Sequence, residues 1–502
     1  MNGPRFTRYE LASAAGGRWI GTPPPHVEGV STDTRQPAPG SCFVALVGER
    51  FDAHGFLAQA QAAGAACAMV NESWAQRTTP SPLPSPLSGG KPPLPLAGGK
   101  PPFPPAGDRE NALPLLAVRD TLQALGMLAR FHRRRFAIPV VGVTGSNGKT
   151  TTREMVGLIL RTRGPALKTE GNLNNEVGVP LTLLGLRPEH QRAVIELGMN
   201  HPGEIARLAE LAEPQVGVVT MAGAGHVEHF GGEVDGVADA KAELYFALPR
   251  SGIAVANADD PRMLRRAQAS GRALLTFALG RGQKGDVLVL EVLEHGPAGL
   301  RFTLGLGQKE VEVRLPLVGL HNAANAAAAA AAAMALGFSD KEIAQGLAQV
   351  QPVGRRLRVE ALPSGVTLVD DCYNANPASM AAALATLGTL AAQGGRAVAV
   401  LGDMLELGPL EDEAHRALGE ASAGVVAHLA AFGPRSRRTA EAARAAGLGD
   451  VFHTEDLTAL VRHLQERLAP GDVVLVKGSR ANHLERLVQA LGSTSTQPGD
   501  AH

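Results

Sequence analysis

The segment Val140–Thr152 constrains the chain more than any other stretch of the sequence. It reads VVGVTGSNGKTTT: an apolar β-branched run, a glycine-rich turn, and then a helix-compatible segment over residues 153–161. This order predicts a phosphate-binding loop, because glycines let backbone N–H groups converge on phosphates and a helix N-terminus adds partial positive charge. Lys149 would reach the β- and γ-phosphates of a nucleotide, and the Thr150 hydroxyl would bind Mg²⁺. The predicted nucleotide contacts are Thr144, Gly145, Ser146, Asn147, Gly148, Lys149, Thr150 and Thr151.

The loop departs from the commonest spacing of such motifs. The pattern G-x-x-x-x-G-K-[ST] requires glycine at position 143, where this sequence has Val143, so the match is to a variant, T-G-x-N-G-K-T. The alternative is a glycine-rich turn between strand and helix that binds no nucleotide. The strand run that leads directly into the loop favours nucleotide binding.

Size and charge narrow the class of protein. A chain of 502 residues exceeds one hydrophobic core and predicts two to four domains. Its 48 basic and 48 acidic residues balance, which argues against nucleic-acid binding or a polybasic membrane anchor. The cysteines Cys42, Cys67 and Cys372 form no CxxC pair. The first ten residues, Met1–Glu10, lack a signal-peptide pattern. The alanine-rich run at 323–336 is too short to cross a bilayer. We therefore expect a soluble cytoplasmic protein without membrane insertion.

The N-terminal residues, up to about 77, predict a small α/β unit. Strands are expected at 27–32 and 42–46, and a helix at 55–64. Within Ser31–Arg35, hydroxyls, a carboxylate and a guanidinium share one turn. This turn could bind a polar ligand, with Arg35 pairing with a phosphate, or it could be a solvated, capped turn.

Residues 79–108 are dominated by Pro, Gly and Ser, and they predict a disordered surface insertion. Regular structure is expected again from a strand at 113–118, followed by an amphipathic helix over 120–134. The basic residues His132–Arg135 are interpreted as the solvated end of this helix.

From 138 to about 351, strand runs alternate with helical patterns, which predicts a parallel sheet covered by helices. Glu196 lies near the carboxyl end of the strand run 193–197, and His226 follows the run 216–221. Because ligands of open α/β sheets bind at the carboxyl ends of strands, both side chains are expected to face the nucleotide. The alternatives are a capping glutamate and a packed or solvated histidine.

From near Arg355, strand runs and helical patterns alternate again, which predicts a second, doubly wound α/β unit. No GxGxxG motif follows its strands, so an NAD site is not expected there. The expected strands are 367–371, 397–401, 425–432 and 473–476, and the expected helices between them are 378–390, 411–421, 439–446 and 457–468.

Seven motifs, in this order, resemble those of the Mur ligases of peptidoglycan synthesis, most closely the MurF type. The resemblance runs from about Val27 to Gln489, apart from the Pro-rich insertion. The motifs are GVTGSNGKT at 142–150, GNLNNEVG at 171–178, VIELG at 194–198, HNAAN at 321–325, DDCYNANP at 370–377, LGDMLELG at 401–408 and KGSR at 477–480.

The resemblance implies an α/β protein of three domains. Residues 1–137 would bind the UDP end of UDP-N-acetylmuramoyl-tripeptide, and 138–352 would form a central ATP-binding domain with a mostly parallel sheet. Residues 353–502 would form a Rossmann-like domain that binds D-alanyl-D-alanine and closes on ATP. ATP would convert the tripeptide carboxylate into an acyl phosphate, which the amine of D-alanyl-D-alanine would attack. We expect a monomer.

The resemblance also implies roles for single residues. Thr150 and Glu196 would hold Mg²⁺, His226 would help bind a second ion, and Lys241 would be carbamylated by CO₂ to give an anionic metal ligand. With Lys149 and Arg356, the residues Glu196, His226 and Lys241 would form the catalytic set. The remaining contacts would be Asn325 to adenine, Arg356 to the γ-phosphate, Asp371 to ribose, Asn172 and Asn175 to the muramyl peptide, and Thr34 and Arg35 to the UDP end.

Two other hypotheses about function stay open. The chain could be another amide ligase of the same fold, adding the third peptide residue or glutamates to folate, although the Asn-rich string at 171–176 argues against both. It could also be a nucleotide-binding protein without catalysis. The presence of Lys149, Thr150, Glu196, His226 and Lys241 together argues against that reading, since binding alone would not need all five.

Overall fold

The computed structural model describes residues 3–36, 38–48, 51–78, 113–225, 227–280 and 285–492. They belong to two compact units: Met1–Ile138 with Thr169–His190, and Pro139–Lys168 with Gln191–His502. The predicted insertion at 79–108 and His226 lie outside the described residues. Among the described helices, none combines the length and the apolar character that crossing a bilayer requires.

The first unit is built on a five-stranded sheet, parallel except for its edge strand β2. In sheet order its strands are β2 (Arg18–Ile20), β9 (Leu115–Val118), β8 (Cys67–Asn71), β5 (Cys42–Val44) and β4 (Val30–Ser31). Two small antiparallel pairs join β1 (Arg5–Thr7) to β3 (His26–Glu28) and β6 (Val47–Gly48) to β7 (Phe51–Asp52). The helices are α1 (Arg8–Ala15), α2 (Leu57–Ala62), α3 (Glu72–Thr78), α4 (Thr121–Arg133) and α6 (Gly178–Leu183).

Two sequence predictions for this unit need correction. The single strand expected at 27–32 is divided at Gly29, whose φ of 93° sends β3 and β4 into different sheets. The basic end of α4 is not solvated throughout, because His132 and Arg133 are buried. His132 Nε2 lies 3.0 Å from the Leu186 carbonyl, and the Arg133 guanidinium donates to two backbone carbonyls just beyond the helix. These buried bonds hold the end of α4.

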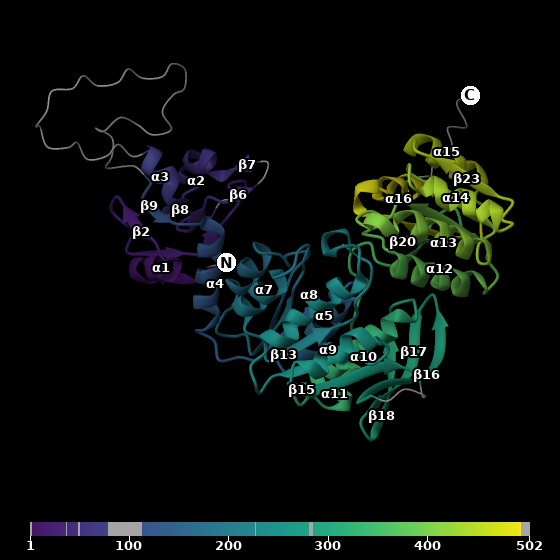
Figure 1. Cartoon of the computed structure of the whole chain (residues 1–502), viewed down its shortest axis with the longest axis horizontal. Coiled ribbons are helices and arrows are strands. Elements are labelled where there is room, and N and C mark those ends of the chain that lie inside the picture. The colour runs from purple at the N-terminus through teal and green to yellow at the C-terminus, as the bar shows by residue number, and fades with distance from the viewer. Residues whose placement is uncertain are drawn as a thin grey trace, which may run out of the picture. The chain divides into compact units, whose positions relative to one another are not determined.

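The second unit contains two sheets (Figure 1). The first has nine strands, of which the first seven are parallel and the last two extend the edge as antiparallel strands. In sheet order they are β11 (Ala166–Lys168), β12 (Arg192–Glu196), β10 (Val140–Thr144), β13 (Val216–Val219), β14 (Ile253–Asn257), β15 (Ala273–Leu279), β16 (Val287–Gly296), β17 (Gly299–Leu306) and β18 (Lys309–Leu315). The accompanying helices are α5 (Lys149–Arg161), α7 (Glu204–Ala212), α8 (Val234–Ala247), α9 (Pro261–Ala269), α10 (His321–Ala335) and α11 (Asp340–Leu347).

Helix α10 lies against both α5 and the nine-stranded sheet. Its alanine run, 326–333, is fully buried, and side chains this small let the helix approach its neighbours closely. At the centre of the sheet, β10 runs between β12 and β13, with Val143 opposite Glu196 and Thr144 opposite Val219. The carboxyl ends of three parallel strands therefore meet beside the start of α5.

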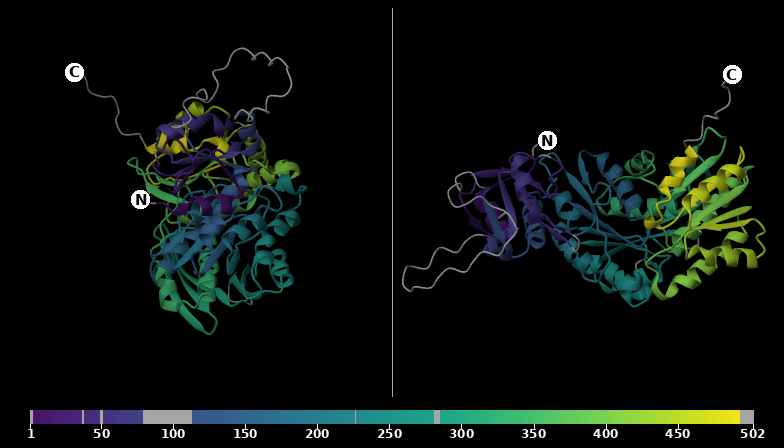
Figure 2. Two further views of the ribbon diagram at one scale, coloured as in Figure 1. Left: turned by 90° about the vertical axis from the view of Figure 1, so that its left-hand side faces the viewer. Right: turned by 90° about the horizontal axis from the view of Figure 1, so that it is seen from above.

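The second sheet of this unit has six strands, parallel except for the antiparallel edge strand β19. In sheet order they are β19 (Arg358–Ala361), β20 (Thr367–Asp371), β24 (Val473–Lys477), β21 (Ala397–Gly402), β22 (His428–Phe432) and β23 (Val451–Thr454). Helices cover both faces of this sheet (Figure 2), and a separate apolar cluster lies on each face. The helices are α12 (Pro377–Ala391), α13 (Glu411–Ala423), α14 (Ser436–Ala445), α15 (Leu457–Arg467) and α16 (Glu485–Gly492). The predicted α/β class, with a mostly parallel central sheet and a doubly wound C-terminal sheet, is confirmed.

Candidate active site

The glycine-rich loop connects β10 to α5 as the sequence predicts. Gly145 and Gly148 have φ angles of 147° and 80°, a region of backbone conformation that favours glycine. Lys149 begins α5, and its Nζ donates to the Gly145 carbonyl at 2.7 Å. The loop thus curls around the lysine ammonium group, in the arrangement that a phosphate-binding loop requires.

The segment that follows β13 braces the loop. Ser146 N donates to the Met221 carbonyl at 2.8 Å, and the Thr220 hydroxyl donates to the Asn147 carbonyl at 2.5 Å. A Cβ built on Gly145 would collide with the Thr220 hydroxyl. The close approach of these two segments leaves room only for glycine at position 145.

Thr150, in the first turn of α5, meets Glu196, the last residue of β12. The Thr150 hydroxyl donates to Glu196 Oε1 at 3.1 Å, and both side chains are buried. Burial lowers the pKa of Lys149, and Glu196 acts in the opposite direction by favouring the charged ammonium. Oxygen atoms of a hydroxyl and a carboxylate are ligands that Mg²⁺ prefers, so this pair fits that ion.

Lys241 lies on α8 with only 2% of its surface exposed. Desolvation lowers its pKa well below that of an ordinary lysine, and the nearby charge of Lys149 adds to this. Among the residues that the structure describes, no carboxylate forms an ion pair with Lys241, and no group of three or more His, Cys, Asp or Glu side chains gathers as a metal cluster. Because the charge of Lys149 acts on Lys241, the two lysines belong to one electrostatic site.

Asn325 and Arg356 also lie near the loop. Asn325 is buried, donates to Asn322 Oδ1 at 2.9 Å, and abuts Gly148, where an added Cβ would collide with its Oδ1. The charge of Arg356 lowers the pKa of Lys149 further. Its neighbour Arg355 instead pairs with Asp370 at 2.9 Å, so Arg356 is the arginine that faces the loop.

Two partners of these residues were not predicted. The Arg356 guanidinium lies 3.9 Å from the centre of the Tyr373 ring, a cation–π contact that orients it. Lys477, at the end of β24, donates from Nζ to Asp371 Oδ2 at 2.7 Å. Asp371 Oδ1 accepts from the backbone N–H of Leu357, which has a φ of 48°. Lys477 could have been found by the signal that identified Glu196, a charged residue at the carboxyl end of a buried strand.

The predicted substrate residues of the first unit make local contacts. The Arg35 side chain is 88% exposed and pairs with Asp33 at 2.8 Å, and Thr34 donates to Gln59 at 3.3 Å. Asn172 and Asn175 are exposed, and Asn175 Oδ1 accepts from the N–H of Gly178 at 2.8 Å, where α6 begins. Their proposed roles toward substrate remain predictions.

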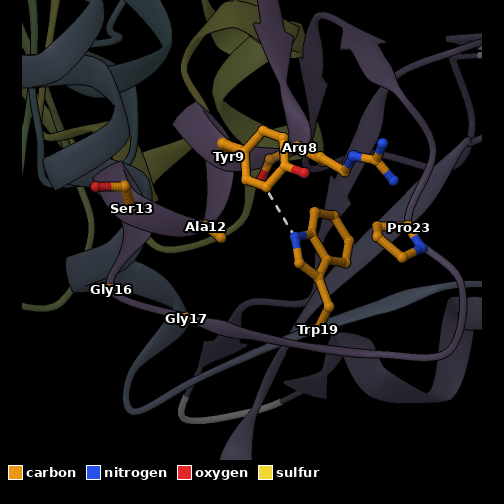
Figure 3. A pocket seen from close by; sticks show the side chains of 8 residues that line it. All are labelled: Arg8, Tyr9, Ala12, Ser13, Gly16, Gly17, Trp19 and Pro23. Atoms are coloured by element: carbon orange, nitrogen blue, oxygen red, sulfur yellow. Dashed lines mark hydrogen bonds between the residues drawn. The ribbon is translucent and has the colours of Figure 1, made fainter.

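A surface hollow of about 490 Å³ lies elsewhere in the first unit (Figure 3). Tyr9 and Trp19 line it, and the Trp19 indole N–H donates to the Arg8 carbonyl at 3.1 Å. None of the predicted site residues that the structure describes lines this hollow.

Two family models match the chain: the Mur ligase middle domain over residues 143–333, and the Mur ligase glutamate ligase domain over residues 355–480. Over 94% of its length, the chain is 39% identical to the UDP-N-acetylmuramoyl-tripeptide–D-alanyl-D-alanine ligase of Escherichia coli strain K12, covering 95% of that protein. The chain belongs to the Mur ligase family. Within this family its relatives are of the MurF type, as the motifs predict.

Solved MurF structures agree with this placement. A crystal structure of MurF from Acinetobacter baumannii matches with a TM-score of 0.83 and 35% identity, over 98% of this chain and all of that one. MurF from Thermotoga maritima, solved in complex with ADP, matches with a TM-score of 0.76 and 27% identity, over 92% of this chain and 96% of that one. Membership of the Mur ligase family therefore explains both the fold and the presence of the phosphate-binding loop.

Proposed function

We propose that this chain joins D-alanyl-D-alanine to UDP-N-acetylmuramoyl-tripeptide at the expense of ATP, in the synthesis of peptidoglycan. Membership of the family supports a ligase. The observation that supports the proposal is the hydrogen bond between Thr150 and Glu196 beside Lys149, together with the buried Lys241, on which the charge of Lys149 acts. The cytoplasm is the proposed compartment and a monomer the proposed state.

The chemistry explains why cations are needed. A carboxylate is a poor electrophile, so the γ-phosphoryl group of ATP is first transferred to the terminal carboxylate of the tripeptide, giving an acyl phosphate and ADP. The amine of D-alanyl-D-alanine then attacks the acyl carbon, and the C–O bond to phosphate breaks as the amide forms. Bringing a carboxylate to a triphosphate concentrates negative charge, which Lys149 and Arg356 would offset.

Thr150 and Glu196 would hold Mg²⁺, with His226 at a second ion. Bound there, Mg²⁺ would neutralise charge on the β- and γ-phosphate oxygens. Asn325 would contact adenine and Asp371 the ribose. Asn172 and Asn175 would contact the muramyl peptide, and Thr34 and Arg35 the UDP end.

Lys241 is the proposed site of a carbamate. A buried lysine of lowered pKa presents a neutral amine, the form that adds to CO₂, with loss of one proton, to give an anionic carbamate. The resulting oxygens would be metal ligands, whereas an ammonium would repel Mg²⁺. Labelled bicarbonate should give a carbamate carbon signal that Lys241→Ala removes, together with a loss of ligase rate of roughly a hundredfold or more. Small carboxylic acids should restore part of that rate, and failure of both results would refute the carbamate.

The ligase proposal is tested by phosphate release from ATP. Release should require UDP-N-acetylmuramoyl-tripeptide and D-alanyl-D-alanine together, and Lys149→Ala should abolish it. Hydrolysis of ATP that is indifferent to D-alanyl-D-alanine would instead favour another amide ligase or a nucleotide-binding protein without this activity.

A further inference from the structure

Arg153 is the largest fully buried side chain among the described residues, and none of the roles proposed above uses it. It lies on α5, three residues after Thr150, so both side chains lie on the same face of the helix. Its Nη2 lies 2.8 Å from Glu154 Oε1, and its Nε lies 3.6 Å from Glu196 Oε2. The proposed metal ligand Glu196 thus has a buried guanidinium beside it.

Packing alone does not explain an arginine at this position. Removing a guanidinium from water costs several kcal/mol, and replacing buried ion pairs with apolar residues of similar volume is often neutral or stabilising. The surrounding core of this sheet is apolar and could accept a leucine or a methionine. The positive charge of Arg153 therefore acts on the carboxylates that it faces.

Two side chains of α5 flank the Glu196 carboxylate, one beside each oxygen. Oε1 accepts the Thr150 hydroxyl bond at 3.1 Å, while Oε2 faces Arg153. Because both contacts come from one helix, they restrict rotation of the carboxylate plane. A carboxylate whose orientation is already restricted loses less conformational freedom when it binds a metal ion.

Arg153 is itself held in place. The second oxygen of Glu154, Oε2, lies 2.5 Å from Lys168 Nζ, at the end of β11. Glu196, Arg153, Glu154 and Lys168 therefore form a row of alternating charges, and all four side chains are largely buried. From Lys168 the chain continues directly into the segment that contains Asn172 and Asn175.

We propose that Arg153 is a positioning residue that holds Glu196 in the orientation needed to bind the metal ion of the Mg²⁺–nucleotide complex. The inference rests on the proposed role of Glu196. Arg153 itself touches neither nucleotide nor metal in this assignment, and acts through the carboxylate that it faces.

The test measures binding rather than catalysis. ADP binding to the full chain is followed by titration calorimetry as a function of MgCl₂ concentration, and again in EDTA. Arg153→Lys keeps the charge but loses the planar fork, and it should raise the Mg²⁺ concentration for half-maximal enhancement of ADP binding by roughly 10- to 100-fold. ADP affinity in EDTA should stay within about twofold of wild type, because the loop contacts to phosphate do not involve Arg153.

Arg161→Lys is the matched control, since Arg161 lies exposed on the last turn of the same helix and should leave the Mg²⁺ curve unchanged. If Arg153→Lys does not fold, as judged by thermal unfolding, Lys168→Met at the far end of the row should shift the curve in the same direction by a smaller factor. A wild-type Mg²⁺ curve in every folded variant would overturn the proposal, and so would an equal loss of affinity with and without Mg²⁺. If ADP binding to the wild-type chain is itself indifferent to Mg²⁺, the metal role of Glu196 fails together with this inference.

Discussion

At the scale of single residues, the phosphate-binding loop depends on glycines for two separate reasons. Gly148 has a φ of 80°, and a Cβ at this position would also collide with Asn325 Oδ1. Gly337 has a similar φ of 76° but faces open space. Comparing substitutions at these two positions therefore distinguishes the effect of backbone strain from that of steric collision.

Gly148→Ala should weaken ADP binding strongly. Left-handed backbone at a non-glycine residue costs about 1–3 kcal/mol, and displacing the buried Asn325 adds to this and moves the loop N–H groups. Titration calorimetry with Mg²⁺ and ADP measures the loss. Gly337→Ala should lower stability alone and leave ADP affinity intact, and equal affinities in the two variants would contradict this account.

His321, the first residue of α10, should make stability depend on pH. Burial lowers its pKa to about 4, and the charges of Lys477 and His295 act in the same direction. An unfolded histidine titrates near pH 6.5, so between about pH 6.5 and 4 the unfolded chain binds a proton that the folded chain does not. Stability is therefore complete above about pH 6.5 and falls as the pH drops through this window.

Urea unfolding at pH 7 and pH 5 checks this sign. His321→Gln should remove a slope of at most about 1.4 kcal/mol per pH unit. His201→Gln, at a histidine whose side chain is 62% exposed, serves as the control for replacing an imidazole at the surface. A steeper loss of stability in His321→Gln than in the wild type would show that the sign is wrong.

At the scale of elements, the alanine run of α10 sets the distance between helix and sheet. Ala329 is fully buried, so Ala329→Leu should overpack the core and lower the free energy of unfolding by about 1–3 kcal/mol. Ala381→Leu adds the same atoms to an exposed position of α12 and should change stability little. Urea denaturation of both variants compares them, and equal stabilities would show that α10 can move away from the sheet.

The elements also show which predictions a sequence supports. Thr150 and Glu196 could be predicted because a local motif and the end of a strand place them, and the parallel order brings the strand ends together. The pairing of Asp371 with Lys477 depends on β20 and β24 being neighbours in the sheet. The two residues are 106 positions apart, and the sequence does not show that their strands are adjacent. Arg153 looks like any polar residue of an amphipathic helix until the strand beneath it is known.

At the scale of the whole molecule, the second unit joins its two sheets through the loop itself. Asn147 and Asn376 exchange two hydrogen bonds, Nδ2 to Oδ1 at 3.1 Å and 2.8 Å, across 229 residues of sequence. Asn376 Oδ1 also accepts from the N–H of Ser379 at the start of α12. The nucleotide loop and the start of α12 are thus held by one amide pair.

This pairing predicts coupling between the two asparagines. Asn147→Ala and Asn376→Ala should each lower the free energy of unfolding, and the double variant should lose less than the sum of the two by about 1 kcal/mol, because the second substitution removes a bond already broken. Asn376 also caps α12, so Ser379→Ala serves as a control that weakens the cap without touching the pair. Its effect should add to that of Asn147→Ala within about 0.3–0.5 kcal/mol. Additive losses for Asn147 and Asn376 themselves would mean that the amide pair does not link the loop to α12 in solution.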